Sequence, residues 1–574
     1  MRRVTGAIAF VCAAAAAVLH AQNREWTTSN GDAQRTSWVA TDARLTKDAV
    51  AKGDFKFLWK LKLANETRQL NSLTQPILLD RLISHRGFKA LAFVGTSAER
   101  IYAIDTDLAR LYWETVINYS SITPPANSTA ACPGGLVAAV SRPTALAPGF
   151  GRAGGGRGGR SGSSVGEPGK GAPSLQAVAG AGRGTGDPAA AAGRGAAPAA
   201  APAAQGRGAA RGGGGLGGGP TDNVYVLASD GFVRALNAHN GSERYPAAQF
   251  VPANAKVSGI TFIDGVLYAT TSGNCGAVPN GVYAIDLDSQ EKKPVSWRTN
   301  GPGIAGTAGP AFGSDGTVYV AISGDAAAAA PATPPDATNH ASSIVALEAR
   351  TLKVKDWFTA PGADFNASPV VIRHKEKDLI AVTANDGKLY LLDGTSLGGS
   401  DHKTPLHVTG KYTSAGVTAS VSTWEGDGVH WILAPVAGAP AADVKFTANG
   451  LRPNGGIVAF KLADQGGKIL LEPAWASRDM TSPLTPVVFN GVVFAIASGE
   501  YRAAADPKLT SAQRAQRSIP AILYAFDPAT GKELWTSGKT ITSFAKSGLS
   551  ASAGQVYLVT FDNTLYAFGI PMEH

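Results

Sequence analysis

The stretch YAFDPATGKELW, residues 524–535, decides the fold because variants of it recur along the chain. Tyr524 and Phe526 alternate with smaller residues, which is typical of a strand with one buried face. Asp527 to Gly531 predict a turn, because an Asp side chain bonds the backbone ahead of it and Gly accepts a positive φ. A second strand then carries Trp535, a large side chain that predicts a packing anchor.

Copies of this unit run from one end of the chain to the other, which indicates a repeat architecture. They occupy residues 102–113, 233–245, 283–297, 344–357, 389–397, 457–475 and, truncated, 565–570. Six of the ten tryptophans stand at the anchor position or its N-terminal equivalent, which makes chance a poor explanation. These six are Trp59, Trp113, Trp297, Trp357, Trp475 and Trp535.

Two further strands precede each copy. Asp-Gly or Asn-Gly pairs separate alternating apolar runs at residues 264–265, 315–316 and 490–491, and this is the strongest short signal for a β-hairpin. Each repeat therefore predicts four antiparallel strands. Because four-stranded units repeated around an axis are propeller blades, the expected fold is an all-β propeller.

Counting the repeats predicts eight blades, at residues 70–117, 132–251, 257–299, 307–359, 365–411, 417–477, 481–538 and 545–574. The last blade lacks its outer strand, and residues 55–63 (FKFLWKLKL) at the other end of the chain can supply it. Pairing the first strand with the last closes the ring and removes an exposed edge. Seven blades is the competing count, because the motifs of the second and fifth blades are weak.

The N-terminus predicts export. Arg2 and Arg3 precede an apolar run over residues 7–19, and Ala21 ends a plausible cleavage site, so residues 1–21 are expected to be a signal peptide. An uncleaved anchor is the alternative. No later stretch has the roughly 20 apolar residues of a membrane helix. The expected location is the periplasm or the outside of the cell, with residues 22–574 as a single propeller domain.

Residues 147–220, inside the second blade, are dominated by Gly, Ala, Pro and Arg. Such a segment cannot bury enough apolar area to offset ordering entropy, so we expect a disordered surface insertion. It carries eight basic and two acidic residues and accounts for most of the net charge of +9. RNA binding through its GRGGRSG piece is the weaker reading, because the rest of the chain is nearly neutral. Residues 325–339 and 500–518 are expected to be longer loops.

Cys132 and Cys275 are the two cysteines that remain after removal of the signal peptide. An oxidising compartment allows a disulfide between them. Sequence alone does not show whether the two Cα atoms approach closely enough, so two separate buried thiols remain the alternative.

The repeat resembles that of the pyrroloquinoline-quinone (PQQ) enzymes, whose Ala, Asp, Thr-Gly and Trp positions match Ala525, Asp527, Thr530-Gly531 and Trp535. Residues 26–61 are similar to the entry segment of quinoprotein alcohol dehydrogenases. The resemblance covers nearly the whole chain outside the insertion and implies a quinoprotein-like propeller. It does not carry activity, because the same repeat also builds non-catalytic propellers such as an outer-membrane assembly scaffold lipoprotein.

In the active dehydrogenases, the resemblance implies PQQ on the propeller axis, a Ca²⁺ ion held by Glu and Asn, and an Asp as general base. This chain lacks an adjacent cysteine pair, an acidic residue around Cys132, and a segment matching the base. PQQ therefore remains a possible cofactor, calcium is not supported, and no metal ligands are assigned. The nine histidines are scattered and form no spaced ligand motif.

Polar residues just before the inner strands are the best candidates for a site, because a propeller presents such positions to its central funnel. Candidates for cofactor binding are Arg68, Asn71, Asp364 and Asn366; Arg478, Asp479 and Lys546 complete the set. The alternative is turn chemistry, since Asn and Asp bond local backbone before strands.

Two functions follow from these observations. The preferred one is a propeller that binds a protein, a glycan or a small molecule at its mouth, or acts as a scaffold, without a complete quinoprotein site. The other is a PQQ-dependent dehydrogenase that acts on an alcohol or a sugar. Nucleic acid is a disfavoured partner.

Overall fold

The computed structural model describes residues 25–84, 87–118, 128–146, 222–324, 340–502 and 508–571. All of them belong to one compact unit. The predicted signal peptide and the insertion 147–220 lie outside the described residues, so both stay predictions. No helix in the described part of the chain is long and apolar enough to cross a membrane.

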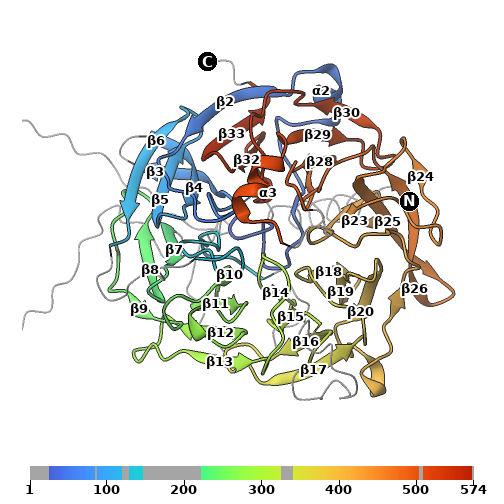
Figure 1. The fold of residues 1–574 in the computed structure, drawn as a ribbon, viewed down its shortest axis with the longest axis horizontal. Helices are drawn as coiled ribbons and strands as arrows, with labels where there is room; N and C mark the ends of the chain where they lie inside the picture. The colour runs from blue at the N-terminus through green and yellow to red at the C-terminus, as the bar shows by residue number, and fades with distance from the viewer. Residues whose placement is uncertain are drawn as a thin grey trace, which may run out of the picture. The chain divides into compact units, whose positions relative to one another are not determined.

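Within these ranges, eight small, mainly antiparallel sheets stand around an axis and form an eight-bladed β-propeller (Figure 1). The prediction of eight blades is confirmed and the count of seven is wrong. Blade 1 holds β3 (Ile77–Ser84), β4 (Gly87–Gly95), β5 (Arg100–Asp105) and β6 (Arg110–Val116). Blade 2 holds β7 (Asn223–Leu227), β8 (Phe232–Asn237) and β9 (Ala248–Gln249). Blade 3 holds β10 (Val257–Ile263), β11 (Val266–Thr271), β12 (Gly281–Asp286) and β13 (Val295–Arg298).

The remaining blades follow in chain order. Blade 4 holds β14 (Ala311–Phe312), β15 (Val318–Ile322), β16 (Ser343–Leu347) and β17 (Val354–Thr359). Blade 5 holds β18 (Val370–His374), β19 (Lys377–Thr383), β20 (Leu389–Asp393) and β21 (His407–Val408). Blade 6 holds β22 (Ser422–Gly426), β23 (Val429–Ala437), β25 (Gly455–Gln465), β26 (Lys468–Ala476) and an added β24 (Thr447–Ala448). Blade 7 holds β27 (Val487–Phe489), β28 (Val492–Ala497), β29 (Ile522–Phe526), β30 (Glu533–Thr536) and an added β1 (Trp38–Val39).

Blade 8 closes the ring. It holds β31 (Ser550–Ser552), β32 (Gln555–Thr560) and β33 (Thr564–Gly569), and its outer strand is β2 (Lys56–Lys62) from the other end of the chain. β2 pairs antiparallel with β33, with Leu61 opposite Leu565. The predicted closure by residues 55–63 is therefore confirmed.

Blade 2 differs from the expected four strands. Its inner strand is reduced to one bridge, in which Ser141 and Tyr225 exchange both backbone hydrogen bonds at 2.9 and 2.7 Å. The next pairing position on this side is Pro143, which has no N–H to donate. The ladder therefore ends after a single pair.

The recurring indoles contact the blade that follows their own. Trp59 Nε1 donates to the Thr106 carbonyl at 3.1 Å, which links blade 8 to blade 1. Trp113 Nε1 donates to the Ala238 carbonyl at 2.7 Å, which links blade 1 to blade 2. Three further indoles make ring contacts with the next blade: Trp297 with His340, Trp357 with His402, and Trp535 with Phe568.

Trp475, between blades 6 and 7, is the most deeply buried of the six indoles. Its side chain is 1% exposed, and its Nε1 donates to the Pro528 carbonyl at 2.8 Å. That carbonyl belongs to the turn of the repeat motif, in which Asp527 Oδ1 accepts from the backbone N–H groups of Ala529 and Thr530. The motif residues thus shape a turn that receives the neighbouring blade's indole.

We expect Gly531→Ala to lower the free energy of unfolding by about 1–3 kcal/mol more than Gly491→Ala. Both glycines have positive φ, +69° and +75°. A Cβ on Gly531 would lie 2.2 Å from Trp475, whereas one on Gly491 would meet nothing within 4 Å. Urea unfolding measures both variants. Equal losses would show that the indole does not seat on this turn.

An axial segment, residues 26–39, threads around the ring axis and appears in blue inside the ring in Figure 1. It hydrogen-bonds to the innermost backbone of seven blades in turn, with donor–acceptor distances of 2.8–3.0 Å. Its partners from blade 1 to blade 7 are Leu78, Arg142, Ile260, Phe312, Val371, Thr423 and Val488. The chain then passes through α2 (Lys47–Lys52) to the outer strand β2.

Candidate ligand-binding funnel

A cavity of about 310 Å³ lies on the ring axis, and every blade contributes to its lining. The contributing residues come mainly from the connections that lead into the inner strands, such as 70–75, 306–308, 418–420 and 546–548. In blades 1 to 7 these connections precede the residues that bond the axial segment. The cavity and the axial segment therefore occupy successive levels along the axis, and the segment forms the floor of a funnel.

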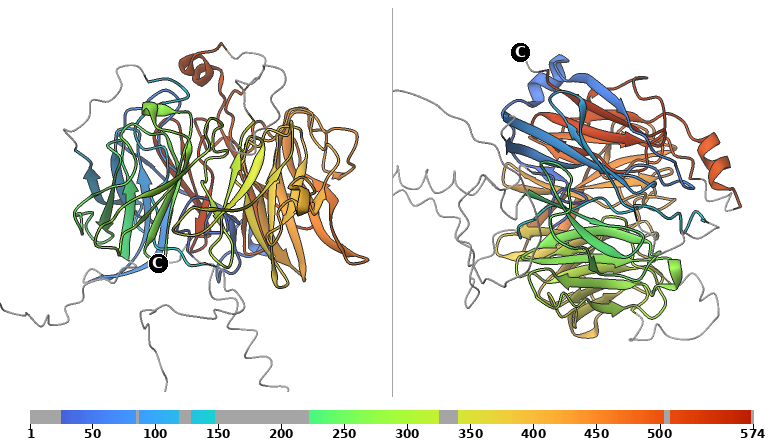
Figure 2. Two further views of the ribbon diagram at one scale, coloured as in Figure 1. Left: turned by 90° about the horizontal axis from the view of Figure 1, so that it is seen from below. Right: turned by 90° about the vertical axis from the view of Figure 1, so that its left-hand side faces the viewer.

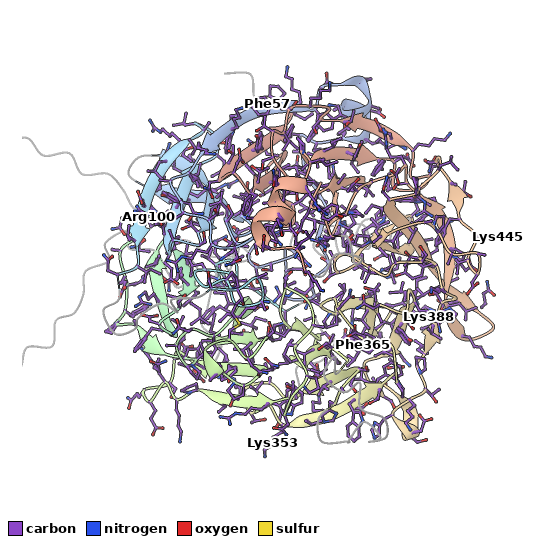
Figure 3. All side chains as sticks on the ribbon, in the orientation of Figure 1. Phe57, Arg100, Lys353, Phe365, Lys388 and Lys445 are labelled. Atoms are coloured by element: carbon purple, nitrogen blue, oxygen red, sulfur yellow. A yellow bond between two sulfur atoms is a disulfide. The ribbon has the colours of Figure 1, made fainter. Side chains whose placement is uncertain are left out.

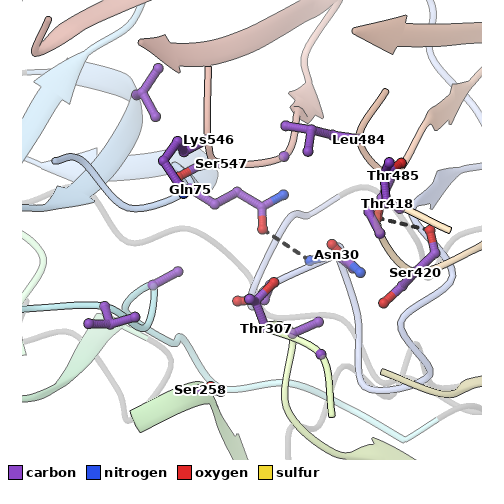
Figure 4. Close-up of a pocket in the computed structure, with 18 of the residues that line it drawn as sticks. Asn30, Gln75, Ser258, Thr307, Thr418, Ser420, Leu484, Thr485, Lys546 and Ser547 are labelled. Atoms are coloured by element: carbon purple, nitrogen blue, oxygen red, sulfur yellow. Dashed lines mark hydrogen bonds between the residues drawn. The ribbon is translucent and has the colours of Figure 1, made fainter. Parts of the chain in front are cut away.

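Ser29 and Asn30 of the axial segment provide this floor. The Asn30 backbone N–H donates to Gln75 Oε1 at 3.3 Å, as drawn in Figure 4. Gln75 Nε2 donates in turn to the Leu549 carbonyl at 2.6 Å, which joins blade 1 to blade 8. The floor is thus fixed by hydrogen bonds rather than by apolar contacts alone.

The funnel wall is rich in amide and hydroxyl groups. Six of them are Asn71, Thr307, Asn366, Thr418, Thr485 and Thr560. Among the described residues, no Asp, Glu or His side chain lines the cavity. Such a wall can donate and accept hydrogen bonds to a small polar molecule, but it contains no carboxylate or imidazole that could move a proton.

Two cations, Lys546 and Arg502, also line the funnel, and both contact a carboxylate behind the wall. Glu500 is only 1% exposed. Its Oε1 accepts from Lys546 Nζ at 2.8 Å and from Arg514 Nη2 at 3.1 Å, and its Oε2 accepts from Arg502 Nε at 2.6 Å. These four residues are named the Glu500 cluster. Arg514 comes from α3 (Ser511–Arg517), which rises from one face of the ring in Figure 2.

The charges of the cluster determine its protonation. Burial would raise the pKa of Glu500, but Arg502 and Lys546 outweigh it and hold that pKa at about 2. The Glu500 carboxylate is therefore ionised at neutral pH. Burial lowers the pKa of Lys546, and Glu500 opposes that shift. About a third of the Lys546 side chain remains accessible because it faces the funnel.

A further cation, Lys256, lies at the start of blade 3 and is partly buried. No described side chain forms a hydrogen bond or an ion pair with its ammonium group. Burial lowers the pKa of Lys256, and the charge of Lys546 lowers it further. Lys256 is not among the residues that line the cavity, but Ser258, two residues further along the chain, is.

A disulfide joins Cys132 to Cys275, with Cα atoms 5.5 Å apart. Sequence had left this pairing open. The bond ties the connection between blades 1 and 2 to η2 (Cys275–Ala277) of blade 3. A Cβ on Gly273 would lie 3.3 Å from Cys275 Sγ and 3.9 Å from Lys256 Cδ, so the disulfide lies beside Lys256.

Three of the seven polar candidates line the funnel: Asn71, Asn366 and Lys546. The two amides also hydrogen-bond to the backbone that leads into the following blade. Asn71 Nδ2 donates to the Gly134 and Leu136 carbonyls at 2.9 and 3.1 Å. Asn366 Nδ2 donates to the Val417 carbonyl at 3.1 Å. These bonds reach backbone 51 to 65 residues away, so they are not local turn chemistry, and a role of either residue in cofactor binding stays a prediction.

The other four candidates, Arg68, Asp364, Arg478 and Asp479, are not brought to the funnel wall. Asp364 accepts from the Gly324 N–H and from Asn385 Nδ2, which lie 40 and 21 residues away, so its bonds join separate loops. Arg478 pairs with Glu533 at 2.5 Å. Asp479 accepts from the backbone and side chain of Asn454. Arg68 lies near Gly134, in the connection before blade 2.

Sequence reasoning missed Glu500, Arg502 and Lys256. Glu500 and Arg502 belong to the stretch 500–518, which was expected to be only a longer loop. Lys256 directly precedes a strand, the same signal that identified Lys546, but its Ala-Lys-Val context is not distinctive. The axial floor has no sequence signal of its own beyond the polar patch at residues 31–35.

No family model matches the chain, and no curated protein sequence matches it. Several solved structures match its fold. Quinohemoprotein alcohol dehydrogenase from Comamonas testosteroni matches at 14% identity and TM-score 0.53, over 100% of this chain and 83% of that one. A europium-containing methanol dehydrogenase matches at 10% identity and TM-score 0.52, over 96% and 99%. The quinohemoprotein alcohol dehydrogenase ADHIIG from Pseudomonas putida HK5 matches at 12% identity and TM-score 0.52, over 100% and 84%.

These likenesses show that the chain shares the eight-bladed propeller fold of those dehydrogenases, and at 10–14% identity they show the fold alone. The wall residues do not fit a calcium-dependent dehydrogenase site. Ca²⁺ takes oxygen ligands that include carboxylates, and alcohol oxidation needs a base. No described group of three His, Cys, Asp or Glu side chains could hold a metal ion. Glu500 is the nearby carboxylate, and its pKa of about 2 makes it a weak base.

Proposed function

We propose that the protein is a binding propeller that holds a small polar molecule in the axial funnel and does not oxidise it. The observation that carries this proposal is the wall itself. It has amides and hydroxyls from around the ring, the two cations Arg502 and Lys546, and no carboxylate or imidazole among the described lining residues. The cavity volume of about 310 Å³ suits a metabolite-sized ligand.

The wall and the floor of the funnel are held in place by hydrogen bonds and ion pairs. The axial segment holds seven blades in fixed positions around it. Gln75 and the Glu500 cluster are fixed by hydrogen bonds and ion pairs. A preformed wall loses little conformational freedom when a ligand enters, which favours affinity.

We also propose that the protein is exported to the periplasm or beyond the cell. The Cys132–Cys275 disulfide supports this, because disulfides persist in oxidising compartments. The predicted signal peptide at residues 1–21 points the same way.

A screen for thermal stabilisation tests the binding function, because a ligand that binds only the folded state raises Tm. We expect at least one small polar metabolite to raise the Tm of the wild-type chain and to leave that of Thr307→Trp unchanged. Thr307 is exposed within the cavity, so an indole there fills the funnel without disturbing a packed core. Ligands that stabilise both proteins equally, or no ligand at all, would contradict the proposal.

A PQQ-dependent dehydrogenase is the second candidate, supported by the fold likeness to the quinohemoprotein alcohol dehydrogenases. It predicts reduction of an electron-accepting dye when PQQ, Ca²⁺ and an alcohol or aldose are added. We expect no turnover above a PQQ-only control. Turnover that is lost in Thr307→Trp would establish the enzyme in place of the binding protein.

A further inference from the structure

The charges around the funnel do not balance. Lys546, Arg502 and Arg514 share one carboxylate, Glu500, so this cluster keeps two positive charges in excess. Lys256 adds another, and no described side chain pairs with it. Arg502, Arg514 and Lys546 meet at Glu500 between blade 7 and the connection to blade 8, whereas Lys256 comes from the start of blade 3.

Such an excess is costly unless something offsets it. Cations removed from water lose hydration, and a paired negative charge restores much of it. Only Glu500 supplies that charge among the described neighbours of Lys546 and Arg502. The wall around these two side chains offers hydroxyl and amide groups, which are neutral.

The cations are also held in place. Arg502 donates to Glu500 through Nε and to the Thr418 carbonyl through Nη1 at 2.9 Å, which leaves Nη2 without a described partner. Lys546 uses Glu500 for one of its three N–H donors. Lys256 lies beside the Cys132–Cys275 disulfide, which constrains the loop around it. Fixed donors with unused N–H groups are the usual means of recognising an anion.

We propose that the funnel selects a metabolite-sized polyanion, with its negative groups at Lys546 and Arg502 on the wall and at Lys256 next to it, and its neutral part against the amides and hydroxyls of the wall. This inference rests on the proposed binding function and names the ligand class. Carboxylates and phosphates share the required chemistry, and the test below distinguishes them.

Calorimetric titration at low salt tests the inference with three probes: citrate, inorganic pyrophosphate and the neutral polyol glucitol. We expect citrate, pyrophosphate or both to bind the wild-type chain at least tenfold more tightly than glucitol. Affinity should fall as salt is added, because salt screens the charges. The anion that binds more tightly identifies the source, carboxylate or phosphate.

Lys256→Gln is the decisive variant, because Lys256 has no described partner and its loss should not disturb the fold. It should weaken anion binding at least tenfold. Lys353→Gln is the matched control, since Lys353 is exposed at the rim of the ring (Figure 3) and should bind as the wild type does. A thermal melt of each variant shows that it is folded.

The outcomes separate the two proposals. The inference is overturned if Lys256→Gln binds the anion as tightly as the wild type. It is also overturned if Lys353→Gln loses as much affinity as Lys256→Gln does. If glucitol binds as tightly as the anions and this binding is lost in Thr307→Trp, the preference for anions is overturned. The proposed binding function of the funnel would still be supported. Anion binding that survives in Thr307→Trp lies outside the funnel and overturns the inference, while the thermal screen still decides the binding function. No anion binding at 10 mM probe, on the order of the weakest specific affinities, overturns the inference.

Discussion

Glu500→Gln is expected to lower the free energy of unfolding by about 3–5 kcal/mol, because it removes the one carboxylate from a set of three cations. Arg502, Arg514 and Lys546 all contact this carboxylate, which is 1% exposed. The amide that replaces it cannot offset their charges. Urea unfolding at neutral pH measures the loss.

The control is Glu533→Gln, which breaks a partly exposed pair with Arg478 and should cost at most about 1 kcal/mol. If Glu500→Gln costs no more than this control, the Glu500 cluster does not hold the mouth of the funnel together.

The same residue gives the wild-type chain a pH dependence with a defined sign. The folded pKa of Glu500 is about 2, which is below its ordinary value. Its stabilisation is therefore complete above the ordinary glutamate pKa of about 4.3 and is lost as the pH falls from there towards 2. The difference in stability between the wild-type chain and Glu500→Gln should shrink over that window. A constant difference from pH 5 to 2 would mean that Glu500 titrates normally.

Arg35→Met is expected to lower the free energy of unfolding by about 3 kcal/mol, because it leaves several buried oxygens without a donor. Arg35 is 0% exposed within the axial segment. Its guanidinium donates to the Pro310 carbonyl at 2.9 Å and to the Ser29 carbonyl at 2.8 Å, and it also reaches Thr261 Oγ1. These bonds join the segment to blades 3 and 4.

The loss should be accompanied by release of the funnel floor. Limited proteolysis should cut Arg35→Met within residues 25–45 sooner than it cuts the wild type, because local opening exposes the backbone. Arg350→Met is the control, since Arg350 is about half exposed and pairs with Asp286 at the surface. Wild-type stability and wild-type proteolysis in Arg35→Met would show that the segment is held by its other bonds.

The sequence predicted the repeating parts of the fold well, because their causes are local. The turn at Asp527 to Gly531 and the indole of Trp535 recur with a fixed spacing, so each copy supports the others. Closure by residues 55–63 followed from a missing strand at one end and a spare one at the other. The short inner strand of blade 2 was not predicted, although Pro143 explains it once the neighbouring strand is known.

The funnel could be predicted only in part. Asn71, Asn366 and Lys546 were found because they precede inner strands. Glu500 was not, because its role depends on Lys546, which the fold brings from another loop, and on Arg514, which α3 folds back towards it. The route of the axial segment was likewise hidden, since its hydrogen bonds go to the backbone of seven blades, and backbone partners leave no mark on the sequence.

Hydrogen exchange of the full chain, with and without the tightest probe from the titrations, tests most directly whether the axial funnel is the binding site. Binding there predicts slower exchange in segments from several blades at once, including residues 70–75, 306–308, 418–420 and 546–548. Protection confined to one blade, or to the outer strands of the ring, would contradict an axial site.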